Sequence, residues 1–407
     1  MRIAEAEFTI VSVPYTHREN SAQVNRDGVT DIIVKLTTDD GLVGWGESCS
    51  GSNVESVLEV LNACRPMLIG RDPWNRDAIW HDCFRNDLWF YRESIFNLAY
   101  PGIDIALWDL CGKAVGQPLY RLFGGLRRRE VGYFCYTSYG DLETLRRECR
   151  DGVARGYTQF YRKVGVDIEH ELEAMAIMRE EIGPHGFIQL DGNESWTVAE
   201  AVRNLTALDR WTVGFAEQPV PSQPIENMIE LKAKTPVPLA FNEGLWRVDR
   251  VTEVIRRRAA DYLVFGPYWV GTLANFNRLS HQAAIEGLVV NKHTHGELGI
   301  FAAANQHVLL TLPRINAGNQ QTAQMMRDDV LTTTIPIADG PTWGIPEGPG
   351  LGVDVDEVKV ERYHANYRAV GQYLPYQIER MGREDPDWQP AIAAGGAAIL
   401  RSERTNG

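Results

Sequence analysis

The 407-residue sequence lacks the features that mark several classes of protein. Its six cysteines form no C-x-x-C pair, and so few in so long a chain favour buried free thiols over a disulfide framework. The first residues, MRIAEAEFTIVSV, carry charges and contain no signal-peptide core. No window holds 18 consecutive apolar residues, so we expect no transmembrane helix and no membrane partner. Together these absences predict a cytoplasmic protein.

Basic residues are outnumbered by acidic ones. The sequence has 41 Lys and Arg against 54 Asp and Glu, for a formal net charge of -13 at pH 7. Because this surplus repels phosphate backbones, we expect no nucleic-acid partner. A small anionic substrate stays open, since a local pocket can invert the average field. With 44% hydrophobic and 23% charged residues, the composition is that of an ordinary globular protein.

The N-terminal part of the sequence has the pattern of a small α+β unit. Residues 3–13 and 30–37 are rich in β-branched residues and predict strands, and the polar stretch 15–27 between them predicts a loop. The turn signal DDG at 39–41 indicates that the second and third strands form a hairpin. From 53 to about 117 the apolar spacing becomes helical.

From about residue 131, short apolar runs alternate with helical patterns. The runs are 131–136, 160–164, 187–190, 213–216, 237–241, 262–265, 288–291 and, weakly, 314–316. This alternation predicts a parallel sheet, and the number of units predicts a closed (β/α)8 TIM barrel. A doubly wound open sheet is the alternative, but it would need a G-x-G-x-x-G loop after an early strand, and none occurs.

Three of these runs end in a carboxylate, and the three residues are spaced 26 positions apart: Asp191, Glu217 and Glu243. Catalytic groups of a barrel come from the C-terminal ends of its strands, so the three should converge. A lone Asp or Glu there is usually a helix cap. Three at equal spacing instead predict a site for a hard divalent ion, Mg²⁺ first and Mn²⁺ second. Strand alternation lets only one of Asn242 and Glu243 face it, and the spacing favours Glu243.

Basic groups end two further runs. By alternation Tyr161 and Lys163 share one face of their strand and Arg162 takes the other. A lone lysine is usually solvated, but one inside a cavity beside a metal can act as a base. His293 and His295 follow the run 288–291, and either could be an acid or a base. The H-x-H pair could also bind zinc, but no third His or Cys lies nearby in the sequence.

These residues resemble the enolase superfamily, in its mandelate racemase/muconate lactonizing branch. The motifs that carry the resemblance are GIDIALWD with GG at 102–125, D-x-N-x-x-W at 191–196, E-Q-P at 217–219 and GPGLG at 348–352. The similarity spans residues 1 to about 370. It implies a modified, enolase-like TIM barrel at 129–352 and an α+β N-terminal capping domain at 1–128.

The resemblance also implies that the C-terminal tail, 353–407, completes the capping domain. The strand-like stretch 358–362 within this tail is expected to pair with the first unit. Loops at 15–25 and 48–53 would cover the barrel mouth and choose the substrate. The candidate substrate-contacting residues in these loops are Tyr15, His17, Arg18, Ser48 and Cys49.

The family pattern assigns roles to the strand-end residues. Lys163 matches the second Lys of a K-x-K pair, the base on one face of the substrate, and His293 matches the acid or base on the opposite face. His295 is a rival for that role, and Asn193 is a supporting residue. The residues that match the three Mg²⁺ ligands are Asp191, Glu217 and Glu243.

Two positions depart from the family pattern. The first Lys of K-x-K is Tyr161 here, so Lys163 could be tuned differently, with help from Arg162. Gly266 ends the sixth strand, where the family has an Asp partner for the His or a second Lys. A histidine without that Asp is less firmly oriented, and Glu297 is the candidate to compensate.

The resemblance implies Mg²⁺-dependent abstraction of the proton next to a carboxylate, through an enediolate. Lys163 is present, but His293 on the opposite face lacks its usual Asp partner. We therefore predict a lyase that dehydrates a hydroxy acid or sugar acid to a 2-keto acid, with His293 protonating the leaving hydroxyl. A racemase, epimerase or cycloisomerase is the alternative, and a non-catalytic metal-binding member is a second. The expected partners are a small carboxylate substrate and further copies of the chain, as a dimer or octamer.

Overall fold

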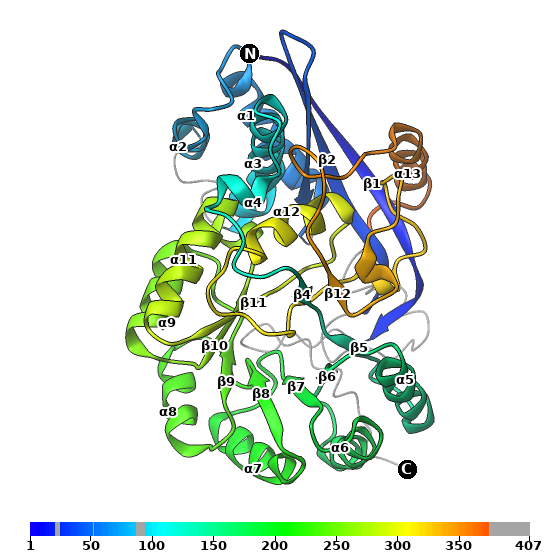
Figure 1. Ribbon diagram of the computed structural model, residues 1–407. Coiled ribbons are helices and arrows are strands. Elements are labelled where there is room, and N and C mark those ends of the chain that lie inside the picture. Colours follow the sequence, from blue (N-terminus) through cyan, green and yellow to red (C-terminus); the bar gives the residue numbers. More distant parts are fainter. Residues whose placement is uncertain (21–24, 52, 87–93, 374–407) are drawn as a thin grey trace, which may run out of the picture.

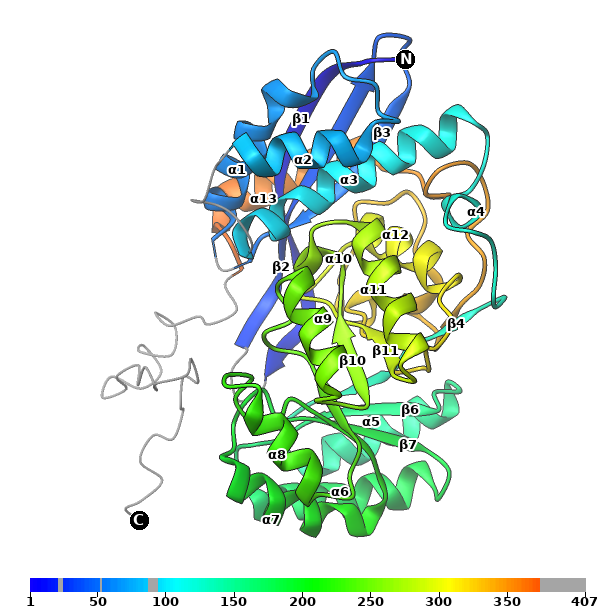
Figure 2. The ribbon, with the colours of Figure 1, turned by 90° about the vertical axis from the view of Figure 1, so that its left-hand side faces the viewer.

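We describe a computed structural model, in which residues 1–20, 25–51, 53–86 and 94–373 are placed. A three-stranded antiparallel sheet and its helices form a cap over one end of a seven-stranded parallel sheet (Figures 1 and 2). The cap strands are β1 (Ile3–Asn20), β2 (Asn25–Thr38) and β3 (Val43–Cys49), in that order. The predicted hairpin between the second and third strands is confirmed, since β2 pairs with β3 across the turn at 39–41.

The loop predicted at 15–27 is wrong in the part that the structure describes. Strand β1 runs on to Asn20 and β2 begins at Asn25, with the pair Glu19 and Arg26 in register. Their side chains form an ion pair at 2.6 Å, and that of Glu19 is only 5% exposed. The polar composition that suggested a loop therefore reflects a strand extension whose charges pair with each other. Residues 21–24 lie outside the description.

The cap helices pack on its sheet. They are α1 (Val54–Leu68), α2 (Arg76–Asn86), α3 (Ser94–Ala114) and α4 (Leu119–Leu122). Every residue of α3 from Phe96 to Gly112 except Leu98 is buried, because the helix lies between the cap sheet and the barrel. The approach of β3 to α3 requires glycine, since a Cβ on Gly46 would lie 1.8 Å from the carbonyl oxygen of Gly102.

The second unit is the predicted barrel. Its parallel strands are β5 (Cys135–Thr137), β6 (Gln159–Lys163), β7 (Phe187–Asp191), β8 (Val213–Glu217), β9 (Leu239–Phe241), β10 (Tyr262–Phe265) and β11 (Val289–Lys292). They are hydrogen-bonded in chain order. The helices that alternate with them are α5 (Leu142–Ala154), α6 (Ile168–Ile182), α7 (Val198–Leu208), α8 (Glu226–Lys234), α9 (Val248–Arg257), α10 (Pro267–Val270), α11 (Leu273–Ile285) and α12 (Gly299–Leu309).

The weak eighth run forms no regular strand, yet its segment links both edges of the sheet. Val290 N donates to Arg314 O at 3.0 Å, and Gln320 N donates to Lys292 O at 2.8 Å. On the other edge Phe134 N donates to Asn319 O at 3.3 Å. These bonds close the ring, so the open-sheet alternative is wrong.

The C-terminal segment returns to the cap, but as a helix. The predicted strand at 358–362 is wrong, since α13 (Glu357–Val370) covers it. Asp356 caps this helix by accepting hydrogen bonds from the N–H groups of Val358 and Lys359, which outweighs the strand preference of its β-branched residues. Helix α13 lies along β1 (Figure 1), where Asn366 Nδ2 donates to Ser12 O at 2.8 Å.

Two short strands complete the fold: β4 (Val131–Gly132) pairs with β12 (Thr342–Trp343). The largest apolar core lies between the barrel strands and their helices and extends into the cap, and a second lies between the cap sheet and its helices. A small separate cluster is formed by Phe215, Ala240 and Val264 of β8, β9 and β10. All six cysteines are buried and free, as predicted. No helix in the placed ranges combines the length and apolarity needed to cross a membrane.

Candidate active site

A cavity of about 620 Å³ lies between the cap and the C-terminal ends of the barrel strands. The cap contributes residues of β2, β3, α1 and α3 to its wall. The barrel contributes strand-end residues, and these include Lys163, Asn193, Glu243, His293 and His295. With Cys49 of the cap, six of the residues predicted from the sequence as functional thus meet around one space.

Lys163 ends β6 and reaches across to the end of β7. Its Nζ lies 2.7 Å from Asp191 Oδ2 and 2.5 Å from Asn193 Oδ1, and its side chain is only 8% exposed. Burial pushes the pKa of Lys163 down, but the Asp191 carboxylate outweighs burial and raises it overall. As placed, the ammonium group therefore neutralises part of the carboxylate charge beneath the cavity.

The three predicted carboxylates are all buried or half-buried at neighbouring strand ends. Asp191 and Glu217 are paired in register on β7 and β8, and Glu243 follows β9. Both Asn242 and Glu243 line the cavity, but Asn242 directs its amide to the Val264 carbonyl of β10. Asn193 Nδ2 donates to Glu243 Oε1 at 2.7 Å.

Burial and mutual repulsion dominate the electrostatics of these acids. Burial, with the neighbouring Asp191 charge, raises the pKa of Glu217 well above its usual value and that of Glu243 to about 8. Within the described chain, Glu243 Oε2 is buried with no hydrogen-bond partner. Without a cation the protonated forms of Glu217 and Glu243 are therefore favoured, and a cation bound among these acids would favour their charged forms.

This donor set fits a hard divalent cation. All its ligand atoms are oxygens, and one of them is buried and unpartnered. As they stand, the described side chains form no ready-made group of three metal-ligating residues, and Lys163 and Asn193 bond to Asp191 and Glu243 instead. A cation would have to replace those contacts.

The two residues of β6 before Lys163 confirm the predicted alternation of faces. Tyr161 points the same way as Lys163, and its hydroxyl donates to Asp191 Oδ2. Where the family pattern has a lysine, this chain thus holds the carboxylate with a phenol. Arg162 faces the opposite side, where Nη1 donates to Ser138 O at 2.7 Å, so it lies away from the cavity. The predicted help of Arg162 in tuning Lys163 has no contact to support it.

His293 follows β11 and makes a hydrogen bond that the sequence did not reveal. Its Nδ1 meets the hydroxyl of Tyr268, a buried residue of α10. Burial and the nearby cationic groups lower the pKa of His293 well below its usual value. Burial likewise lowers the pKa of His295 to about 3, and Trp269 Nε1 donates to its Nε2 at 3.2 Å.

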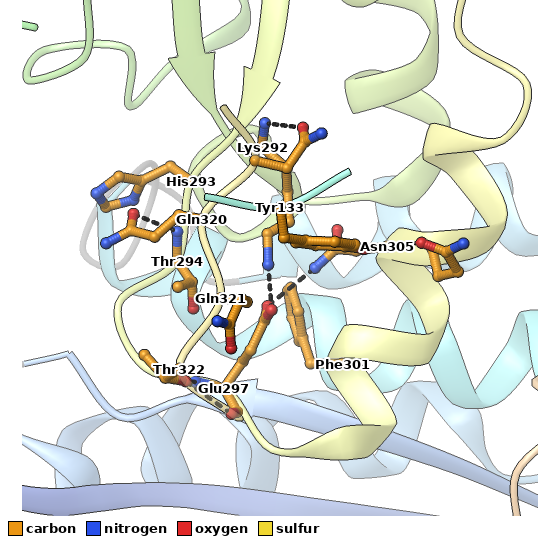
Figure 3. Close-up of polar contacts among 12 residues, drawn as sticks. Tyr133, Lys292, His293, Thr294, Glu297, Phe301, Asn305, Gln320, Gln321 and Thr322 are labelled. Carbon is orange, nitrogen blue, oxygen red and sulfur yellow. Dashed lines mark hydrogen bonds and ion pairs between the residues drawn. The ribbon is translucent and has the colours of Figure 1, made fainter. Parts of the chain in front are cut away.

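Glu297 does not contact His293. Its carboxylate forms a buried ion pair with Lys292 and accepts from Asn305 Nδ2 at 3.0 Å (Figure 3). The compensation predicted for Glu297 is therefore not made directly. Glu297 instead anchors the segment between β11 and α12, which carries both histidines.

The candidate substrate-contacting residues of the cap do not all face the cavity. Cys49 lines the cavity, whereas Ser48 Oγ turns away and donates to Ala99 O of α3 at 2.5 Å. Tyr15 is 3% exposed and lies in β1, in a bridge with Met326. His17 and Arg18 also belong to β1, but their side chains lie outside the description.

The sequence analysis missed several wall residues. Arg26 of β2 points at the barrel, where Nη1 donates to His295 O, and Glu19 Oε2 accepts from its Nε at 2.6 Å. Gln320 accepts from Thr294 N at 3.0 Å (Figure 3) and also lines the cavity. Their signals were weak, because Arg26 lay in a stretch that suggested a loop and Gln320 followed the irregular eighth run.

Comparison with known proteins agrees with this architecture. Residues 144–359 match the enolase C-terminal domain-like family, and residues 6–124 match the N-terminal domain of mandelate racemase and muconate lactonizing enzyme. The chain belongs to the enolase superfamily, in the mandelate racemase/muconate lactonizing enzyme branch.

Relatives within the superfamily carry out different reactions. The N-succinyl-L-Arg/Lys racemase of Bacillus cereus is 29% identical over 364 residues, covering 88% of this chain and 96% of the racemase. Its crystal structure superimposes with a TM-score of 0.82. The arabinonate dehydratase of Saccharolobus solfataricus is 27% identical over 340 residues, covering 82% of this chain and 90% of the dehydratase.

A further solved structure contains a metal. The enolase of Thermobispora bispora, crystallised with magnesium and formate, superimposes with a TM-score of 0.86 at 24% identity, covering 98% of this chain and 99% of that one. At this level of identity the likeness concerns the fold.

Proposed function

We propose that this protein abstracts the proton next to a carboxylate and eliminates a β-hydroxyl group, which converts a hydroxy acid or sugar acid to a 2-keto acid. One observation carries the proposal: Lys163 and His293 come from non-adjacent strands, β6 and β11, and line the same cavity. The predicted Mg²⁺ ligands lie at the ends of β7, β8 and β9, between those two strands in the sheet.

Asp191, Glu217 and Glu243 are the residues that would hold Mg²⁺, which members of this superfamily use. Bound there, the ion would polarise the substrate carboxylate and make its α-proton more acidic. It would also offset the Asp191 charge that now raises the pKa of Lys163, which favours the neutral amine that a base requires.

In the proposed reaction Lys163 Nζ accepts the α-proton. His293 faces the substrate from another strand and assists the departure of the hydroxyl group. Arg26 and its ion-pair partner Glu19 line the cap side of the cavity, where a hydroxylated end of the substrate would bind. The carboxylate end binds toward the barrel and the remaining part extends toward the cap.

Isomerisation is the second candidate, and the racemase among the relatives supports it. Racemisation or epimerisation needs a second group that exchanges a proton with the α-carbon on the opposite face. His293 would be that group. The lowered pKa of its ring does not separate the two reactions, because it weakens the ring as a base and also leaves it without the extra proton of an acid. The contact of Nδ1 with the Tyr268 hydroxyl favours elimination, because it leaves only Nε2 to face the substrate.

The test incubates the full-length protein and Mg²⁺ with a library of hydroxy acids and sugar acids in D₂O. Formation of a 2-keto acid supports the dehydratase, and α-deuterium incorporation without it supports an isomerase. Lys163→Ala should lower either signal about 100- to 10,000-fold. The matched control is Lys234→Ala, at a lysine that is 53% exposed. Full activity of Lys163→Ala would contradict the proposal, and a complete lack of exchange and Mg²⁺ binding would favour a non-catalytic protein.

A further inference from the structure

The residue that contacts His293 does not stand where the family pattern has its partner. Gly266 directly follows β10, the sixth barrel strand, and the hydroxyl of Tyr268, two residues later, lies within hydrogen-bond distance of His293 Nδ1. We propose that Tyr268 fixes the tautomer of His293 with the proton on Nε2, which makes His293 a hydrogen-bond donor to the substrate and not a base. This inference deepens the proposed function and depends on it for its catalytic consequence.

The direction of the hydrogen bond follows from burial. Tyr268 is 2% exposed, and in the described chain His293 Nδ1 is the acceptor that its hydroxyl reaches. Burial keeps the phenol protonated, because it raises the pKa of Tyr268 well above its usual value. If Nδ1 carried the proton and donated it, the phenol hydrogen would be buried without an acceptor, which is unfavourable. The phenol therefore donates, and the ring proton belongs on Nε2.

The charges around His293 favour the same neutral form. The groups that act on its ring are cationic or another imidazole: His295, Lys163, Lys292 and Arg26. An Asp in place of the phenol would accept from Nδ1 and stabilise the imidazolium. A phenol that donates does the opposite, because it competes with a proton for the Nδ1 lone pair.

Gly266 explains how Tyr268 reaches this position. A Cβ built on Gly266 would lie 3.1 Å from Tyr268 Cε1 and 3.1 Å from the His293 carbonyl oxygen. An acid at 266 would thus crowd the phenol that now binds the ring. Trp269 holds the His293 ring from another side, with the ring centroids 4.8 Å apart. The glycine at position 266 therefore leaves the space in which the Tyr268 phenol binds His293.

The consequence is a division of roles in the cavity. Nδ1 is occupied by Tyr268, so Nε2 is the nitrogen left for a substrate, and it carries a hydrogen. Lys163 is then the single base: the α-proton passes to its Nζ, the β C–O bond breaks, and the hydroxyl group leaves as hydroxide hydrogen-bonded to the Nε2–H group. The proton held by Lys163 is returned through solvent, which converts the hydroxide to water. A mechanism that needs His293 to take a proton from the α-carbon does not fit this tautomer.

The direct test is side-chain NMR of the ¹⁵N-histidine-labelled full chain, with His293 assigned by its loss in His293→Asn. Two-bond proton–nitrogen correlations report which nitrogen carries hydrogen. We expect protonated Nε2 and unprotonated, hydrogen-bonded Nδ1 from pH 6 to 8. Tyr268→Phe should give a mixture of tautomers. The control Tyr100→Phe also removes a buried hydroxyl, one without a partner in the described chain, and should leave the His293 signals unchanged. Wild-type Nδ1 protonation, or no change in Tyr268→Phe, would overturn the assignment.

Activity provides the second measurement once a substrate is known. We expect kcat of Tyr268→Phe to fall about 10- to 100-fold with little change in KM, while deuterium exchange at the α-carbon persists. If Tyr268→Phe lost both α-deuterium exchange and product formation, the division of roles would be contradicted. Failure to find any substrate would count against the proposed function alone, because the NMR result does not depend on turnover.

Discussion

The ion pair between Lys292 and Glu297 supports the segment that carries both histidines, and its contribution can be measured. Lys292 is the last residue of β11, its side chain is 1% exposed, and that of Glu297 is 4% exposed (Figure 3). Burial lowers the pKa of Lys292 and raises that of Glu297, so each charge is held in an unfavourable medium and depends on the other. We therefore expect strong coupling between substitutions at the two positions.

Removing one partner leaves the other charge buried and uncompensated. Lys292→Met and Glu297→Gln should each lower the free energy of unfolding by about 3–5 kcal/mol. In the double variant no charge remains, and the glutamine oxygen can still accept from Asn305. The double variant should therefore lie within about 2 kcal/mol of the wild type, because a buried pair is often no more stable than its neutral replacement.

The assay is guanidinium unfolding of the wild type and the three variants at pH 7.5, followed by circular dichroism. The matched control is the same cycle on Lys232 and Asp261, a surface pair with side chains 31% and 41% exposed, which should show coupling below about 1 kcal/mol. Additive losses for Lys292 and Glu297 would refute the reasoning, since they would mean that neither charge depends on the other.

Three further predictions concern the candidate metal site and the contact between cap and barrel. Since the pKa of Glu243 is raised to about 8, Mg²⁺ must displace a proton below that pH. Affinity measured by calorimetry should rise at least about tenfold from pH 6 to 7, because the pKa of Glu217 is raised as well, and a flat profile would contradict this. Tyr161→Phe removes the hydroxyl that orients Asp191 and should weaken Mg²⁺ binding about 10- to 100-fold in the same assay, whereas unchanged binding would count against a metal at Asp191. Glu47 of β3 accepts from two backbone N–H groups at the start of α12, at 2.7 and 2.9 Å. Glu47→Gln can keep only one and should lower the unfolding free energy by about 1–3 kcal/mol, and an unchanged denaturation midpoint would argue against this link.

The strand-end residues could be predicted because local periodicity decides them. A parallel sheet places successive strand ends at one edge, so a 26-residue repeat of carboxylates became Asp191 paired in register with Glu217. The same two-residue period separated Tyr161 and Lys163 from Arg162, and the structure confirms that separation. Each of these conclusions needed only the direction of one strand and the order of its neighbours.

The errors arose where distant parts of the chain outweigh local preference. The polar residues of β1 and β2 suggested a loop because the ion pair of Glu19 with Arg26 is made across the hairpin and is invisible to local composition. Helix α13 contains β-branched residues that suggested a strand, but its cap at Asp356 and its contact with β1 decide its form. Glu297 lies four residues after His293, yet its partner is Lys292, since the chain turns between β11 and α12.

Gly266 shows why a missing residue is weak evidence of a missing function. Compared position by position, glycine in place of an acid suggests a weakened histidine. In three dimensions the same glycine leaves the space that Tyr268 occupies, and the phenol binds the nitrogen that the acid would have bound. The two partners differ in chemistry, because a carboxylate accepts a hydrogen bond from Nδ1–H and a protonated phenol donates a hydrogen bond to Nδ1. The substitution therefore changes which nitrogen of His293 carries hydrogen, and through it the step in which His293 can take part.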